Sequence, residues 1–501
     1  MKAVDECIRA IAKAIGEENV SVDKGTRVVH RVTHGPESLL HKNWDIFTPA
    51  AVVRPGTTEN VVDIVKSANK YEIPLIPQGG RTCTYGAEAI KDSIVIDTAA
   101  GMDKLVNFDP ESFRITVQAG MRVIDYMEFL TNHGFVSLEF PTMNKTSTMG
   151  SRASISGYNK FENRWGGSKD HIKGLEVVLA NGDVVQVGRG SSVPAKSTVG
   201  LNTMDLFIGA RGSLGIITKV TERFIPSLPA YHYGVRGFGT IEDGLKAYME
   251  LRSPLNAGVV WRAKAYHKWM LKQAVGLTTD FVWPEDVEML VDFHLVGVPD
   301  VVESMKKHVL EICEKHNGFW KDDMPPTDFV GRMHETMEKY MGMAALQSER
   351  LVSGGMGNRI VPLDANISNT NLISFYNEYL DFLKRTEKGE KFPALAKHYF
   401  VLSPGAPVPT EMGYTKFWAL MLADSKAFND DTIKEFKDWF REYAELIWKH
   451  GGTVTATHGF IPKDLEIEFL KREVGETGYK LIKTIKQALD PKNIMNPNVR
   501  F

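Results

Sequence analysis

The sequence predicts a protein of the α+β class. Within residues 50–225, short runs of β-branched residues alternate with amphipathic stretches that have helical spacing. Residues 175–187 indicate a β-hairpin, because Asn181-Gly182 suits a tight primed turn between two strand-like runs. From about residue 230 the chain becomes rich in Met and Trp and carries several long amphipathic stretches. Strands and helices are therefore both expected, and 501 residues are enough for two or three domains.

The first half of the chain gives the clearest local signals. Residues 51–55 form a short apolar run closed by a proline, and Thr57 opens a stretch with helical spacing. Further strands are expected at residues 73–76, 94–97 and 114–120, and a helix at residues 123–133. The prolines Pro226 and Pro229 coincide with the change in composition and predict a domain boundary. The tail, from residue 464 onward, is expected to begin as a helix.

The composition excludes several classes of function. Hydrophobic residues make up 43% and charged residues 24% of the chain, which is ordinary for a soluble globular protein. A formal net charge of −2 gives no reason to expect nucleic acid as a partner. No apolar run approaches the roughly 18 residues of a membrane span, so none is expected. The 3 cysteines are widely spaced and the first residues are charged, so we expect a reducing, cytoplasmic location.

The most informative stretch is the loop Pro77-Gln78-Gly79-Gly80-Arg81-Thr82-Cys83-Thr84-Tyr85-Gly86, which follows a short apolar strand. Paired glycines let backbone N–H groups approach an anion closely, and threonine hydroxyls add donors. No G-x-G-x-x-G motif opens a helix here, and no G-x-x-x-x-G-K-[ST] motif occurs, so neither a Rossmann site nor a P-loop is supported. We interpret the loop as a cradle for a pyrophosphate.

Several motifs in a fixed order together resemble a known family. They are the 77–86 loop, the glycines at residues 148–153, the stretch 164–178, the glycine-rich segment 209–218, and the ending Leu489-Asp490-Pro491-Lys492-Asn493-Ile494-Met495-Asn496-Pro497. In this order they are similar to the FAD-binding vanillyl-alcohol oxidase and p-cresol methylhydroxylase superfamily. Within it, the chain most resembles the branch of glycolate oxidase, D-lactate dehydrogenase and alkyl-dihydroxyacetone-phosphate synthase.

The resemblance implies a division of labour along the chain. It implies a two-part FAD-binding domain of the p-cresol methylhydroxylase type and an α+β cap domain that shapes the substrate pocket. We expect the FAD-binding domain at residues 1–225, the cap at 226–455, and a C-terminal segment at 456–501 that returns to the FAD-binding domain. The residues expected to contact FAD are Gly79, Gly80, Arg81, Thr82, Cys83, Tyr85, Gly86, Met149, Gly150, Ser151, Gly157, Gly212, Gly215, Ile217 and Asn496.

The resemblance also bears on how the flavin is attached. Relatives that tether flavin covalently often carry a histidine after the glycine pair, where this chain has Arg81. Cys83 is better explained as a small filler than as a tether. We therefore expect noncovalent FAD, with His398 of the cap as the alternative attachment point.

The strongest catalytic candidate is His458, in the segment Gly451-Gly452-Thr453-Val454-Thr455-Ala456-Thr457-His458-Gly459. This segment resembles the Gly-Gly-Thr and Glu-His-Gly stretch of the hydroxy-acid branch, whose histidine faces the flavin. A histidine titrating near neutrality suits removal of a hydroxyl proton. The glutamate that precedes this histidine in the family is Thr457 here.

A second departure concerns metal. The hydroxy-acid branch often has a His-x-Gly-Asp-Gly-Asn-x-His stretch that holds a divalent ion. The corresponding stretch here is Pro409-Thr410-Glu411-Met412-Gly413-Tyr414-Thr415-Lys416-Phe417-Trp418, which has no histidine, and Glu411 alone does not make a metal site. No metal is therefore expected, and a simple 2-hydroxy-acid substrate is less secure.

Recognition of an anionic substrate calls for arginine, whose planar fork matches a carboxylate or phosphate. Arg350 and Arg359 flank a glycine-rich stretch and lie where the branch often places basic residues. Tyr158 and Tyr414 are further candidates for substrate contact, as aromatic walls of a pocket.

These observations give a leading hypothesis and two alternatives. The leading hypothesis is an FAD-dependent oxidase or dehydrogenase acting on CH–OH groups of a small molecule, with a 2-hydroxy acid favoured and a phenolic alcohol as the variant. The first alternative is a flavin transferase like alkyl-dihydroxyacetone-phosphate synthase, and the second is a noncatalytic flavin-binding subunit. The electron acceptor is left open among oxygen, a quinone, a cytochrome and a protein partner, and a homodimer is left open as well.

Overall fold

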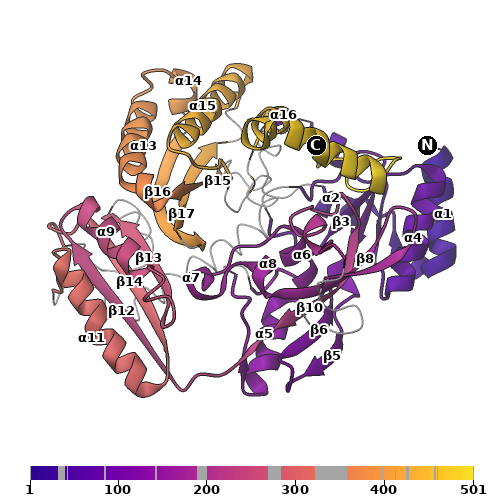
Figure 1. Cartoon of the computed structure of the whole chain (residues 1–501). Coiled ribbons are helices and arrows are strands. Elements are labelled where there is room, and N and C mark those ends of the chain that lie inside the picture. The colour runs from indigo at the N-terminus through magenta and orange to yellow at the C-terminus, as the bar shows by residue number, and fades with distance from the viewer. Residues whose placement is uncertain are drawn as a thin grey trace. The chain divides into compact units, whose positions relative to one another are not determined.

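In the computed structural model the chain forms two compact units, whose elements are labelled in Figure 1. Unit 1 comprises residues 1–157, 168–226 and 461–501, and unit 2 comprises residues 158–167 and 227–460. The structure describes residues 2–31, 40–41, 43–83, 86–141, 144–188, 200–268, 284–321, 358–397, 399–411, 413–424, 428–455, 459 and 461–499. The functional domain boundaries expected from the sequence stay a prediction.

The described residues of unit 1 form three sheets and the helices that pack on them. Its helices are α1 (Lys2–Ile15), α2 (Lys24–Val29), α4 (Thr58–Tyr71), α5 (Val123–Asn132), α6 (Met149–Ser154), α8 (Ser168–His171) and α16 (Lys463–Leu489). Its strands are β1 (Val20–Ser21), β2 (Ala51–Val53), β3 (Leu75–Gln78), β4 (Ile94–Asp97), β5 (Leu105–Asp109), β6 (Arg114–Gln118), β7 (Phe135–Val136), β8 (Ile172–Val178), β9 (Val184–Gly188), β10 (Ile216–Arg223) and β11 (Ile225–Pro226).

The sheets of unit 1 have simple orders. The first runs β1-β2-β4-β3, with β2 and β3 both parallel to β4. The second runs β5-β6-β10-β8-β9 and is antiparallel throughout, and β11 pairs with β7. Because a parallel connection needs a crossover, α4 links β2 to β3 and covers the first sheet.

The local signals in the sequence are confirmed in this unit. Thr57 caps α4, since its side chain accepts a hydrogen bond from the backbone N–H of Asn60. The hairpin turns at Gly182, whose φ of +88° is left-handed, and its strands are β8 and β9. The strand predicted at residues 73–76 lies two residues further on, because β3 pairs with β4 only from Leu75.

The C-terminal tail is joined to unit 1 by a buried ion pair. Lys486, near the end of α16, donates to Asp490 Oδ2 at 2.6 Å and to the carbonyls of Ser213 and Met495, each at 2.8 Å. Asp490 in turn accepts from the backbone N–H groups of Ile494 and Met495. The pair thus shapes the turn after α16 and ties it to the loop at Ser213.

The part of unit 2 that the structure describes contains two antiparallel three-stranded sheets. Their orders are β12-β14-β13 and β15-β17-β16. The strands are β12 (Ala230–Phe238), β13 (Val260–His267), β14 (Met289–Gly297), β15 (Asn358–Ser368), β16 (Tyr399–Glu411) and β17 (Tyr414–Asp424). The helices are α7 (Glu162–Trp165), α9 (Ile241–Leu251), α11 (Pro299–Lys315), α13 (Leu372–Glu387), α14 (Pro393–Ala396) and α15 (Asp430–Lys449).

The long helices of unit 2 contact its sheets. Helices α9 and α11 contact the first sheet, while α13 and α15 contact the second (Figure 1). An aromatic core fills the second interface, where the rings of Phe375 and Phe417 are 5.5 Å apart and those of Trp439 and Tyr443 are 5.7 Å apart. Such offset and edge contacts add to the free energy gained by burying the rings.

The helices were also examined for membrane crossing. Among the residues that the structure describes, no helix combines the length and the apolar character needed to cross a bilayer.

Replacement of Asp490 by alanine is expected to destabilise the protein by about 3–5 kcal/mol, because it leaves the Lys486 ammonium buried without its carboxylate. The measurement is the free energy of unfolding in urea. The matched control is Asp381→Ala, which removes a carboxylate from an exposed pair with Lys384 and should cost less than about 1 kcal/mol. Equal effects of the two substitutions would contradict this account of the tail.

Stability is expected to decrease when the pH is lowered from about 6.5 to about 4. Burial lowers the pKa of His267 and of His294 to about 4, whereas an unfolded histidine titrates near 6.5. Below pH 6.5 the unfolded chain therefore binds more protons than the folded chain, and the stabilisation present above this pH is lost toward pH 4. Urea denaturation between pH 7 and 4.5 should show a smaller loss for His294→Gln than for the native chain, and identical slopes would refute the assignment.

Candidate functional site

The loop after β3 is held at both ends by Gln78. Its side-chain Nε2 donates to the carbonyl of Ala87 at 2.7 Å and to the carbonyl of His30 at 3.1 Å. Its Oε1 lies 2.7 Å from Nδ1 of His30. The buried Gln78 thereby fixes where the 79–86 loop starts and where it ends. Sequence reasoning missed this residue, although its place just before two glycines was the available signal.

The two glycines of the loop lie directly against the segment before α6. A Cβ on Gly80 would lie 1.7 Å from the carbonyl oxygen of Thr146, and one on Gly79 would lie 2.3 Å from Oγ1 of Thr148. No side chain fits at Gly80 without moving the backbone, and one at Gly79 would displace the Thr148 side chain. The first and second predicted cofactor segments are therefore in contact.

The third predicted segment lies against the other two. The backbone N–H of Gly209 donates to Ala153 at 3.2 Å, and that of Arg211 donates to Ser154 at 2.9 Å. Gly212 has a φ of +74°, and a Cβ there would lie 2.3 Å from Cγ of Pro77. Three stretches far apart in the sequence thus meet around the loop after β3.

The C-terminal tail completes the group through Asn496. Its Nδ2 donates to the carbonyl of Gly86 at 2.8 Å and to that of Arg211 at 2.7 Å. The structure therefore brings Asn496 together with Gly86, as both were predicted to lie at one site. The buried Oδ1 of Asn496 has no hydrogen-bond partner within the described part of the chain.

Four other predicted residues have local packing contacts. The backbone N–H of Met149 donates to Met121, and that of Gly150 donates to Ala119, so these amides fix α6. The other contacts are those that a Cβ would make: Gly157 with Nη1 of Arg152 at 2.2 Å, and Gly215 with Cγ1 of Val177 at 2.6 Å. Two further predicted residues have similar local contacts. Ser151 hydrogen-bonds to Thr148, and Ile217 pairs with Val177 of β8. Contact of these six residues with FAD stays a prediction.

Two arginines add positive charge near the loop. Arg81 takes a left-handed backbone with φ +54°, and its Nη1 donates to the carbonyl of Val29 at 2.6 Å. Arg211 also has φ +54°, and its side chain lies 3.5 Å from Glu466. Burial lowers the pKa of Arg211 to about 10, which still leaves it charged at neutral pH. Sequence reasoning named Arg81 but not Arg211.

The loop has the features that an FAD diphosphate requires. In the described chain, no hydrogen bond is made by the backbone N–H groups of Gly80 or Thr82, so both can donate to an anion. Arg211 provides positive charge, and the glycine pair leaves no side chain in the way. Cys83, half-buried beside Arg211, forms no disulfide with any described cysteine. The residues present therefore fit the cofactor.

Several predicted residues lie outside the described part of the chain. These are His458, Arg350, Tyr85 and His398. Arg359 lies on β15, where only its backbone is described. In unit 2, the ring of Tyr158 lies 4.3 Å from the Lys416 ammonium, and Tyr414 is 39% exposed at the start of β17.

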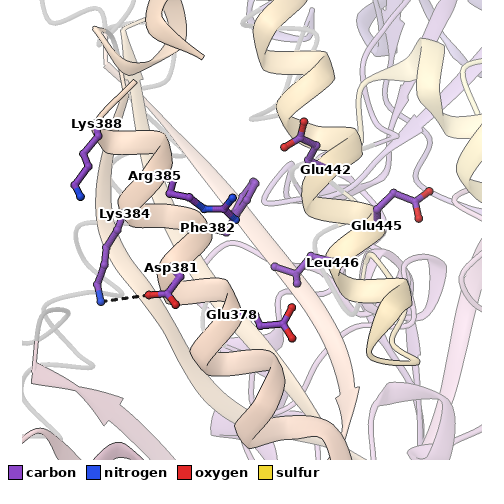
Figure 2. Close-up of a pocket in the computed structure, with 9 residues that line it drawn as sticks. All are labelled: Glu378, Asp381, Phe382, Lys384, Arg385, Lys388, Glu442, Glu445 and Leu446. Carbon is purple, nitrogen blue, oxygen red and sulfur yellow. Dashed lines mark ion pairs between the residues drawn. The ribbon is translucent and has the colours of Figure 1, made fainter. Parts of the chain in front are cut away.

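Two other features do not belong to this chemistry. In the described chain, no group of three or more His, Cys, Asp or Glu side chains is arranged to hold a metal ion. Figure 2 shows an open surface groove between α13 and α15, lined by Glu378, Asp381, Phe382, Lys384, Arg385, Lys388, Glu442, Glu445 and Leu446. None of the residues predicted for the site lies in this groove.

Comparison with known families agrees with this geometry. Residues 49–188 match the FAD binding domain, and residues 421–499 match the C-terminal domain of FAD linked oxidases. The first match contains the 77–86 loop and α6, and the second contains Asn496.

Relatives extend over almost the whole chain. The chain is 26% identical over 496 residues to the mitochondrial D-lactate dehydrogenase [cytochrome] of Arabidopsis thaliana, covering 97% of this chain and 78% of that protein. It is 21% identical over 502 residues to the glycolate oxidase subunit GlcD of Bacillus subtilis (strain 168), covering 97% and 94%.

Solved structures share the fold. An alkyldihydroxyacetonephosphate synthase matches with a TM-score of 0.73 at 17% identity, covering 99% of this chain and 86% of that one. A p-cresol methylhydroxylase with substrate bound matches with a TM-score of 0.72 at 19% identity, covering 100% and 98%.

Replacement of Gly80 by alanine is expected to weaken FAD binding about tenfold or more, because the new Cβ would displace the loop from the Thr146 carbonyl. The measurement is the flavin absorbance retained per protein after purification, followed by titration of the apoprotein with FAD. Gly258→Ala is the matched control, since a Cβ there meets nothing within 4 Å. Full flavin retention by Gly80→Ala would rule out the cradle.

The geometry and the comparisons lead to one conclusion. Glycine loops, a buried amide and an arginine meet around β3, and the family matches cover the same residues. The chain has a p-cresol methylhydroxylase-type FAD-binding fold, matches the FAD binding domain and the C-terminal domain of FAD linked oxidases, and has FAD as its cofactor.

Proposed function

We propose that this protein dehydrogenates a 2-hydroxy acid to the corresponding 2-oxo acid. The observation that carries the proposal is the match over nearly the whole chain to proteins named D-lactate dehydrogenase and glycolate oxidase subunit. When bound, FAD supplies the isoalloxazine ring that accepts the hydride from the α-carbon. The substrate loses one proton and one hydride, so its hydroxyl-bearing carbon becomes a carbonyl carbon.

In this proposal His458 accepts the hydroxyl proton. The described residues just before it support the assignment, because Thr453 and Asn366 of β15 exchange backbone hydrogen bonds of 3.0 Å in both directions. A Cβ on Gly452 would lie 2.6 Å from the carbonyl of Asn366, so the glycine permits this close pairing. Gly452 and Thr453, a few residues before His458, are thus held against β15 of unit 2.

Residues 409–418 lack the two histidines of the metal-holding stretch described above. This absence favours a second candidate, oxidation of a phenolic alcohol. A structure titled 4-ethylphenol oxidase shares the fold with a TM-score of 0.73 at 17% identity. Which substrate class reduces the bound flavin separates the two candidates. In a transferase that carries out no net electron transfer, neither class of substrate would reduce the bound flavin.

A cytoplasmic location is part of the proposal. It is supported by the wide spacing of Cys7, Cys83 and Cys313, which are free thiols in the structure. The names of some relatives include the word mitochondrial, and these names favour a mitochondrial location instead.

Anaerobic mixing of the FAD-loaded protein with D-lactate or glycolate is expected to bleach the flavin absorbance. His458→Gln should slow the bleaching about 10²–10⁴-fold, since a positioned general base contributes this much. His308→Gln, on the exposed side of α11, is the matched control and should bleach as the native protein does. Bleaching by phenolic alcohols alone would replace the hydroxy-acid proposal with the second candidate.

A further inference from the structure

A buried histidine of unit 1 lies beside the loop that follows β3. His30 comes directly after α2, and it is 5% exposed. Its backbone N–H donates to the carbonyls of Arg27 and Val28, so the residue is held at the end of this helix. Both ring nitrogens of His30 have polar neighbours, and these neighbours determine which nitrogen carries a proton.

The side chain of Gln78 assigns one of the two nitrogens. Gln78 Nε2 faces the carbonyl oxygens of His30 and Ala87, so this atom has to be the amide nitrogen, which donates to both. The atom that lies 2.7 Å from Nδ1 of His30 is then the amide oxygen Oε1, which can only accept. Nδ1 therefore carries a hydrogen in the neutral ring as well as in the charged one, and the neutral ring leaves Nε2 unprotonated.

The second nitrogen of the ring faces a carboxylate. Nε2 of His30 lies 3.7 Å from Oδ2 of Asp97, the last residue of β4. The parallel register pairs Asp97 with Gln78, so both partners of the ring lie at the same end of the first sheet. In the neutral ring the lone pair of Nε2 points toward this negative charge, whereas a proton on Nε2 would form an ion pair. His30 can thus gain a proton without losing its hydrogen bond to Gln78.

Burial and nearby arginines oppose this second proton. The charged groups that face His30 are Arg81 from the loop, Asp97 from β4 and Arg54, which follows β2. Burial is the main cause that lowers the pKa of His30 from its ordinary value, Arg81 and Arg54 lower it further, and Asp97 acts in the other direction. The ring is therefore neutral at neutral pH as long as no other anion lies close to it.

Arg81 connects this ring to the predicted cofactor loop. It belongs to the loop, and its Nη1 donates at 2.6 Å to the carbonyl of Val29, the residue before His30. A diphosphate bound in the loop would bring negative charge that offsets the positive charge of Arg81. A cause that disfavours the charged form of His30 would then weaken, so binding of the anion and of the proton would support each other.

We propose that His30 holds the loop after β3 in its FAD-binding geometry and takes up a proton when FAD binds. The neutral ring supports Gln78, which fixes both ends of the loop. The proton comes from the solvent and adds to Nε2, where it forms the ion pair with Asp97. The inference concerns the cofactor, so it goes beyond the proposed function and holds for either substrate class.

The proton uptake has a consequence for affinity. Because the complex would hold a proton that the free protein lacks, FAD should bind more tightly as the pH falls from above the pKa of His30 in the complex toward its lower value in the free protein. Titration of the apoprotein with FAD should therefore give an affinity about 3–10-fold higher at pH 6 than at pH 8.

Two substitutions separate the two roles of His30. His30→Asn keeps an N–H donor for Gln78 but cannot take up the proton, so it should stay within about threefold of the native affinity at pH 8 and lose the pH dependence. His30→Phe keeps a ring but leaves the buried Oε1 of Gln78 without a donor, so it should weaken FAD binding about tenfold at both pH values. His133→Asn, at an exposed histidine that follows α5, is the matched control and should bind FAD as the native protein does.

Calorimetry on the native protein keeps the inference testable if a variant fails to fold. Titration with FAD in two buffers of different ionisation enthalpy reports the protons taken up, which should number about 0.3–1 per FAD near pH 6.5. No uptake by the native protein, or the same uptake and pH dependence in His30→Asn, would overturn the proton uptake. Native affinity of His30→Phe at both pH values would overturn the positioning role. The flavin bleaching that tests the proposed function is a separate readout, so failure of one proposal is distinguishable from failure of the other.

Discussion

The cofactor loops of unit 1 depend on donors supplied by the far end of the chain. Asn496 and Gly86, 410 residues apart, are joined by a hydrogen bond of 2.8 Å, and the same amide bonds to Arg211. Buried carbonyl groups need a donor, and these loops have left-handed turns that no regular sheet can pair. Lys486 plays the same part for Ser213. The positions of the three loops therefore depend on the tail that pairs with β3 at Leu75.

This dependence explains why the ending of the chain is so specific in sequence. Asp490 accepts two backbone N–H groups in the turn and pairs with Lys486, while Asn496 spans two loops. A longer or shorter spacing between Asp490 and Asn496 would move the amide away from both carbonyls. Ile494 and Met495, between them, are buried in the core of the first sheet. Polar residues thus fix the geometry of the tail, and apolar ones supply the free energy of docking.

Much of unit 1 could be predicted from the sequence, because its signals are local. The cap at Thr57, the turn at Gly182 and the alternation in β6 each depend on a few neighbouring residues. The glycine loops were predicted as a set, and the structure brings them together. Gln78 and Arg211 were missed, because their importance comes from partners far along the chain, His30 for Gln78 and Asn496 for Arg211.

Unit 2 was harder to predict for a related reason. Lys264 and Lys416 are more than 150 residues apart on different sheets, and each alone resembles an ordinary strand lysine. Only the register of β13, β14 and β17 shows that both are buried on faces that carry further charge.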